Sequence, residues 1–265
     1  MTVVEALASA RIDAREARLL LAEASGFSEA SVLAHPEREL PQEILSRFRE
    51  MSERRARGEP VAYILGRREF YGLSLAVNPA VLIPRPETEL LVELALERNP
   101  ASVLDLGTGC GAVALAIKRH LPRSRVIAVE ASAAALVVAR HNAANLGLDV
   151  ELRHGKWFEP VAERFALIAS NPPYVAQDDP HLRDGDLRFE PKQALVGGAD
   201  GLDAIRVIAR GAPTHLTPGG WLLVEHGIGQ EDAVRSLLGS AGLEDLRTWP
   251  DLSGIARVSG GRLES

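Results

Sequence analysis

The feature that most constrains the fold is a regular alternation of apolar runs and helical segments from Pro86 onward. The apolar runs predict strands at residues 102–106, 125–130, 150–154, 165–170 and 220–226. Helical patterning occupies residues 87–98, the stretch up to about 120, and residues 133–145, 201–210 and 230–241. Such alternation predicts an α/β fold with a mostly parallel, doubly wound sheet. Two last strands, near 245–249 and 255–259, have only a short turn between them, which predicts an antiparallel final strand.

The first 60 residues have a different pattern and predict helices throughout. Thr2 with Glu5, and Asp13 with Glu16, have the spacing of a capping box at two helix starts. Gly26 is placed to end the second of these helices, since glycine readily adopts the left-handed conformation that closes a helix.

Between the two zones, residues 61–85 carry alternating apolar residues with glycine, asparagine and proline turn signals. This pattern predicts a hairpin-like connector. We therefore expect a helical domain at 1–74, a hairpin linker at 75–85 and an α/β domain at 86–265.

Composition and charge narrow the class of protein. Hydrophobic residues make up 46% and charged residues 25%, as in an ordinary globular protein. The net charge of -6 argues against a chain whose main task is to grip a nucleic-acid backbone. A single cysteine, Cys110, excludes an internal disulfide, and no ligand-spaced His/Cys cluster predicts a metal site. Without a targeting segment or a membrane-spanning apolar run, we expect a soluble, cytoplasmic protein.

A glycine-rich turn follows the first predicted strand of the α/β domain. Gly107, Gly109 and Gly111 come between that strand and a helix, where bare backbone and free N–H groups can receive a ligand. Glu130 ends the next strand, 19 residues beyond Gly111, where a carboxylate can accept hydrogen bonds from ribose. The pattern indicates a nucleoside-containing cofactor; a tight turn with a surface acid is the alternative. Cys110 is interpreted as a small filler, because no base lies nearby in the sequence.

A second motif, Asn-Pro-Pro-Tyr, ends the apolar run at 165–170. Asn171 offers a side-chain oxygen and Pro172 a rigid carbonyl, so the pair can accept both hydrogens of a planar –NH2 group. Tyr174 offers a ring that can stack on such a group. In a doubly wound sheet this motif and the glycine turn lie at the same sheet edge. The combination indicates an amino-methyltransferase; a proline turn with a buried tyrosine is the alternative.

Longer segments resemble a known family. The glycine turn (105–116), SNPPY (170–174) and the connector FYGLSLAVNPAVLIPRPETELLVE (70–93) are similar to the HemK/PrmC family, as are residues 179–206 and 219–227. These are protein-(glutamine-N5) methyltransferases that act on peptide chain release factors. The resemblance implies S-adenosylmethionine as donor and the glutamine of a Gly-Gly-Gln loop as acceptor. It also implies a helical bundle that docks the release factor and a seven-stranded class I methyltransferase domain.

The resemblance also implies which residues bind the donor. The loop residues expected to cradle its methionine part are Gly107, Thr108, Gly109, Cys110 and Gly111. Glu130 would bind the ribose and Trp157 would lie beside the adenine, with Asn171 completing this side. The family usually has Asp in place of Glu130 and an acid or small residue in place of Lys156. These departures concern donor affinity, not the reaction class.

For the acceptor, the resemblance implies that Asn171 and the Pro172 carbonyl hold the glutamine amide. Pro173 and Tyr174 would complete the pocket. Catalysis would then consist mostly of positioning and hydrogen-bond polarisation, with no general base, so neither His181 nor Glu225 is assigned that role.

Charged residues of the connector and of the helical domain leave alternatives open. Arg85 and Glu89 could shape the glutamine pocket or form a salt bridge between domains. Residues 47–68 hold seven arginines against three glutamates, a difference of +4. They could be a docking face for an acidic release factor or a solvated helix face.

Other functions share the Asn-Pro-Pro-Tyr pocket. A DNA adenine methyltransferase would carry a target-reading domain and a basic cleft, which the acidic balance disfavours. An RNA guanine methyltransferase is a further alternative. A donor-binding regulator without enzyme activity is disfavoured because the motif would then have no task.

Overall fold

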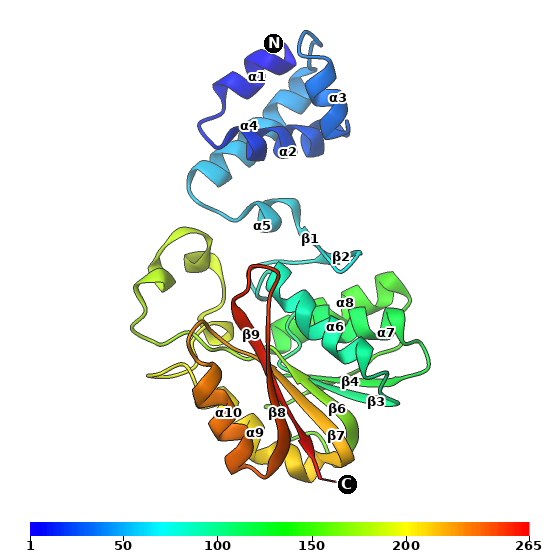
Figure 1. Ribbon diagram of the computed structural model, residues 1–265. Helices are drawn as coiled ribbons and strands as arrows, with labels where there is room; N and C mark the ends of the chain where they lie inside the picture. Colours follow the sequence, from blue (N-terminus) through cyan, green and yellow to red (C-terminus); the bar gives the residue numbers. More distant parts are fainter. Residues whose placement is uncertain (265) are drawn as a thin grey trace. The chain divides into compact units, whose positions relative to one another are not determined.

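The computed structural model describes residues 1–264, which form two compact units (Figure 1). The first comprises Met1–Arg67 together with Arg183–Phe189. The second comprises Arg68–Leu182 and the chain from Glu190 onward. The short segment in the first unit is held there by polar contacts: the Arg55 guanidinium donates to Asp186 at 2.9 Å, and Arg188 donates to the carbonyl of Arg57 at 2.8 Å.

The first unit is helical, as predicted. Its helices are α1 (Val3–Ser9), α2 (Ala14–Ser25), α3 (Glu29–Ala34), α4 (Gln42–Ala56) and α5 (Val61–Leu65). Thr2 and Glu5 form the predicted capping box, and Gly26 ends α2 in the left-handed conformation. Asp13 caps α2, but Glu16 pairs with Arg55. The apolar faces of the helices meet in one core; among its members are Leu20, Leu21, Val32, Phe48 and Met51.

The connector forms a hairpin, which lies within the predicted residues 61–85. Its strands are β1 (Arg67–Phe70) and β2 (Leu73–Ala76), whereas a hairpin linker was predicted at 75–85. Residues beyond Ala76 form no strand up to β3, because prolines at 79, 84 and 86 cannot donate to a ladder. Asn142 ties β2 to the glycine turn: it bonds both the N–H and the carbonyl of Ala76, and it donates to the carbonyl of Cys110 at 2.9 Å.

The second unit contains a seven-stranded mixed sheet of order β5-β4-β3-β6-β7-β9-β8. Its strands are β3 (Ser102–Leu106), β4 (Arg125–Glu130), β5 (Glu151–His154), β6 (Phe165–Ser170), β7 (Leu216–Glu225), β8 (Leu243–Pro250) and β9 (Ala256–Leu263). The first five run parallel, and β9 pairs antiparallel with both β7 and β8. This confirms the predicted α/β fold and the antiparallel final strand.

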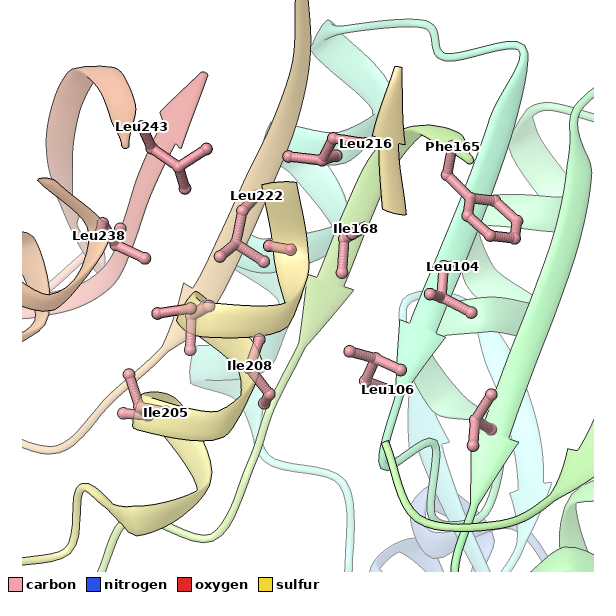
Figure 2. Close-up of a cluster of buried hydrophobic side chains, with 14 of the residues drawn as sticks. Leu104, Leu106, Phe165, Ile168, Ile205, Ile208, Leu216, Leu222, Leu238 and Leu243 are labelled. Carbon is pink, nitrogen blue, oxygen red and sulfur yellow. The ribbon is translucent and has the colours of Figure 1, made fainter. Parts of the chain in front are cut away.

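Helices cover the sheet and bury its apolar side chains. They are α6 (Glu89–Glu97), which follows a 3-10 turn at Pro86–Thr88, then α7 (Ala112–His120), α8 (Ala133–Leu146), α9 (Asp203–His215) and α10 (Glu231–Ser240). Figure 2 shows Ile205 and Ile208 of α9 lying over Ile168 and Leu222 of the sheet. This layered core fixes the strand positions and with them the loops that follow the strands.

The register of the central strands brings three loops together. Leu106 at the end of β3 pairs with Val129 of β4 on one side and with Ser170 of β6 on the other. The residues that follow these three in the sequence are Gly107, Glu130 and Asn171. Strand order reverses at β3, so this edge is a topological switch point, where ligands bind in open α/β sheets.

Within residues 1–264, no helix has the length and apolar character that crossing a bilayer requires. The same residues hold no group of three or more His, Cys, Asp and Glu side chains able to bind a metal ion.

Candidate functional site

A cavity of about 530 Å³ opens at this sheet edge in the second unit. Six of the residues predicted from the sequence line it: Gly107, Gly109, Glu130, Trp157, Asn171 and Pro173. Lys156 also lines it. The carboxyl ends of four different strands, β3 to β6, therefore contribute to one site. Its volume lies in the range of pockets that bind cofactors and drug-sized ligands.

The glycine turn leaves bare backbone at the cavity. Gly109 has φ 60°, and a Cβ atom there would meet no atom within 4 Å, so the absent side chain leaves room beside the cavity. Gly111 has φ 91°, and a Cβ there would lie 2.9 Å from Leu115, so it lets α7 start close to the turn. The turn thus presents backbone, and not side chains, to a ligand.

Glu130 is tied to this turn by its carboxylate. One oxygen accepts from the Gly109 N–H and the other from the Ser132 N–H, each at 2.8 Å. Each oxygen retains a further lone pair for a ligand hydroxyl. The carboxylate is thereby fixed in place at the cavity wall, which suits a residue that must hold two neighbouring hydroxyls.

Asp105 supports the turn from below and was not singled out from the sequence. It is buried, and one oxygen accepts from the Thr108 hydroxyl at 2.6 Å and from the Ala114 N–H at 3.2 Å. Burial raises the pKa of Asp105 to about 6, although these hydrogen bonds act against the rise. Its position within the strand sequence LDLG was the available signal, because a carboxyl group among apolar strand residues needs buried partners.

Trp157 and Cys110 differ in how they meet the cavity. Trp157 lines it with a backbone φ of 52°, a strained conformation of the kind that is retained at functional sites. Cys110 is buried, and burial raises the pKa of its thiol to about 12. A thiol with so high a pKa is no nucleophile at neutral pH, which agrees with its interpretation as a filler.

The Asn-Pro-Pro-Tyr residues separate into two groups. Asn171 and Pro173 line the large cavity, whereas Pro172 is buried and, like Tyr174, is not part of its lining. The Asn171 amide donates through Nδ2 to the Thr88 hydroxyl at 2.9 Å. The Tyr174 hydroxyl donates to Glu225 at 3.2 Å. Behind the cavity, the motif is therefore held by polar side chains from the connector and from β7.

A second, smaller cavity of about 50 Å³ adjoins the first at Asn171. Residues that line both are Leu82, Gly107, Gly109 and Asn171. Thr108 and Cys110 line only the smaller one, as do Arg85 and Thr88. Asn171 therefore lies between a large space bounded by the glycine turn and a small one bounded by the connector.

The connector is fixed by a buried carboxylate, Glu190. It forms an ion pair with Arg85 and accepts from the Ile83 N–H at 3.0 Å. Both partners belong to the second unit, so Arg85 forms no salt bridge between the units, as one alternative had it. Glu89 accepts from the Tyr71 N–H at 3.0 Å and thus supports the hairpin.

Sequence reasoning missed part of the cavity wall. The lining also includes a loop after the Asn-Pro-Pro-Tyr motif, namely Pro191, Gln193, Ala194, Val196, Gly197 and Gly198. A Cβ on Gly197 would lie 2.4 Å from the Pro173 carbonyl oxygen, so this loop packs directly on the motif. Its glycine pair was the one local signal for such a close approach.

The arginine-rich stretch, apart from Arg68, lies in the first unit and is partly neutralised there. Its ion pairs join Arg47 and Arg67 to Glu23, Arg54 to Glu59, and Arg55 to Glu16 and Asp186. Arg49, Arg57 and Arg68 are exposed. Most of the excess positive charge is therefore neutralised by ion pairs within the unit. A docking role of the exposed arginines stays a prediction.

The sheet order, the glycine turn and the acid at the end of β4 define a class I methyltransferase fold. Residues 86–184 match the family model described as the methyltransferase small domain. A solved methyltransferase from Pyrococcus furiosus superposes with a TM-score of 0.60 at 18% identity, covering 82% of this chain and 99% of that one. At this identity the likeness concerns the fold alone.

The family is defined more narrowly by sequence. Residues 2–66 match the PrmC N-terminal domain. A release factor glutamine methyltransferase of Xylella fastidiosa is 50% identical over 263 residues, covering 97% of this chain and 96% of that protein. One of Neisseria gonorrhoeae is 48% identical over 267 residues, covering 99% and 98%. The chain belongs to the release factor glutamine methyltransferase family, which confirms the resemblance found in the sequence.

Proposed function

We propose that this protein transfers a methyl group from S-adenosylmethionine to the side-chain amide nitrogen (N5) of the glutamine in the Gly-Gly-Gln motif of peptide chain release factors. It would thereby modulate translation termination in the cytoplasm. The observation that carries the proposal is the position of Asn171 between the two cavities, in a chain 50% identical to a release factor glutamine methyltransferase.

The residues present fit the methyl donor. The bare backbone at Gly107 and Gly109 accommodates its amino-acid part, and the fixed carboxylate of Glu130 accepts from its ribose hydroxyls. Trp157 offers a flat apolar face to the adenine. When bound, S-adenosylmethionine supplies an electrophilic methyl group on a sulfonium sulfur, and the acceptor nitrogen takes this group and gives up a proton.

The acceptor is held by hydrogen-bond acceptors. The Asn171 side-chain oxygen and the Pro172 carbonyl would take the two hydrogens of the glutamine –NH2 group, and Pro173 and Tyr174 would complete the pocket. These contacts hold the nitrogen in line with the methyl group and favour its tetrahedral form during transfer. No side chain needs to remove a proton before the transfer, because the amide nitrogen becomes acidic once it is methylated.

The two parts of the chain would divide the work. Residues 1–74 dock the release factor and the linker at 75–85 joins them to the methyltransferase domain at 86–265. Support comes from the match of residues 2–66 to a family domain of their own. The net charge of -6 gives no reason to expect direct binding to nucleic acid.

Transfer of a radiolabelled methyl group to purified release factor tests the proposal. We expect label on the normal factor, none on a factor whose Gly-Gly-Gln glutamine is replaced by alanine, and none on unmethylated DNA. Asn171→Ala should lower kcat by at least about 10²-fold, the usual effect of removing one polarising hydrogen bond. Label on DNA, or on the alanine version of the factor, would contradict the proposal.

A further inference from the structure

Four polar side chains behind the cavity form two hydrogen-bonded pairs. Asn171 follows β6, Thr88 belongs to the 3-10 turn of the connector, Tyr174 ends the motif and Glu225 ends β7. Asn171 donates to Thr88 at 2.9 Å, and Tyr174 donates to Glu225 at 3.2 Å. Thr88 is 4% exposed and Glu225 is 1% exposed, so bulk water does not satisfy their hydrogen bonds.

The single hydroxyl proton of Thr88 determines which atoms donate and which accept in this group. Thr88 has one hydroxyl proton, and because its oxygen accepts from Asn171, that proton must go to another acceptor. The Oε2 atom of Glu225 is buried and has no hydrogen-bond partner within the described residues. The Thr88 hydroxyl also stabilises the charged form of this carboxylate and lowers its pKa. Thr88 therefore has a hydroxyl proton to donate, and Glu225 has a buried oxygen that lacks a donor.

We propose that Glu225 is a positioning residue, which takes the hydroxyl protons of Thr88 and Tyr174 and so fixes the orientation of the Asn171 amide. Thr88 can then only accept from Asn171, which directs the Nδ2 group backward and the Oδ1 oxygen toward the acceptor. This inference rests on the proposed function, because a glutamine –NH2 group needs an oxygen there. A flipped Asn171 would present its own –NH2 group and repel the substrate.

Protonation of Glu225 would remove this control. Burial raises the pKa of Glu225 to about 7; Thr88, Tyr174 and Arg257 lower it, and the nearby Glu87 raises it. A protonated Glu225 can donate to Thr88, which frees the Thr88 proton for Asn171 Oδ1. We therefore expect kcat to fall as the pH drops below about 7, while the affinity for the donor stays constant.

The test compares variants that remove one partner with variants that keep it. Thr88→Val and Glu225→Gln should lower kcat by about 10- to 100-fold with little change in the Kd for S-adenosylmethionine measured by calorimetry. Thr88→Ser keeps the hydroxyl and should restore kcat to within about threefold. The acid limb of the kcat profile should vanish in Glu225→Gln. Ser259→Ala, which removes a buried hydroxyl bonded to His226, is the matched control.

A second readout does not depend on the release factor. NMR titration of carbon-13-labelled glutamate, assigned with Glu225→Gln, should show a higher Glu225 midpoint in Thr88→Val than in the wild type. Tyr174→Phe should also raise the Glu225 midpoint. It replaces Thr88→Val as the test variant if Thr88→Val does not fold.

Two results would overturn the inference: an unmoved Glu225 midpoint in both variants, or a loss of donor affinity that parallels the loss of kcat. Absence of label on release factor with the wild type would instead overturn the proposed function, and the titration would still decide whether Thr88 donates to Glu225.

Discussion

At the scale of single residues, Glu130 connects the glycine turn to the ligand space. Its carboxylate accepts from two backbone N–H groups and lines the cavity, so it braces the turn at the place where we propose that it contacts the ribose.

Glu130→Ala should weaken the binding of S-adenosylmethionine by about 10- to 100-fold, because hydrogen bonds to a charged group are each worth about 1.5–3 kcal/mol. Calorimetry on the full chain measures this. Glu159→Gln is the control, since Glu159 also accepts from a backbone N–H, that of Lys156, but does not line the cavity. An affinity within twofold of the wild type in Glu130→Ala would contradict a role in binding.

Asp105 predicts a pH dependence of stability. The pKa of Asp105 in the folded protein, about 6, lies above the ordinary value of 3.8. The protonated side chain therefore adds fully to the free energy of unfolding below about pH 4, and this addition is lost as the pH rises through 6. In Asp105→Asn, the free energy of unfolding should fall by about 3 kcal/mol less than in the wild type over this pH range. Urea unfolding of both proteins between pH 4 and 7 provides the comparison, and parallel curves would count against it.

The residues found from the sequence share one property: their role can be read locally. Gly107 and Asn171 each follow a strand and Glu130 ends one, so the sheet alone brings them together. Thr88 and Glu225 depend on partners 83 and 51 residues away along the chain, respectively, and no local pattern reveals such pairs.

At the scale of elements, the central strands β3, β4 and β6 were predicted closely because each is a buried apolar run between turn residues. Helix α9 was predicted to end near residue 210 but continues to His215, with Pro213 inside. Burial of Ala209 and Ala212 in the core stabilises this last turn, and packing outweighs the unfavourable intrinsic preference of Pro213. The short helix α5 (Val61–Leu65) was missed because it spans too few residues to show a period.

Strand β9 tolerates no side chain at Gly260. A Cβ there would lie 2.7 Å from the Leu222 carbonyl oxygen and 2.7 Å from the Leu223 side chain. Gly260→Ala should therefore cost about 1–3 kcal/mol, as overpacking does in a closed core. Denaturant unfolding measures the change. Ser253→Ala, in the exposed turn before β9, is the control, and equal stabilities of the two variants would show that the strand can shift.

At the scale of the whole molecule, two units of different kinds share one chain, and the first includes a segment, Arg183–Phe189, that comes from the middle of the second. The sequence predicted both kinds of unit, because helical and alternating patterns differ. The sequence could not predict that Arg183–Phe189 belongs to the first unit, because this segment has no strand or long helix of its own. Its place depends on the hydrogen bonds of Asp186 and Arg188 to the first unit.

The position of β9 has a consequence for biosynthesis. A ribosome releases β8 before β9, yet β8 joins the sheet only through β9. The nascent chain therefore exposes the outer edge of β7 until β9 emerges and inserts between its two neighbours. Completion of the domain is thus deferred until β9 has been synthesised, and a chain that stops before β9 leaves β8 without a partner and β7 as an open edge prone to aggregation.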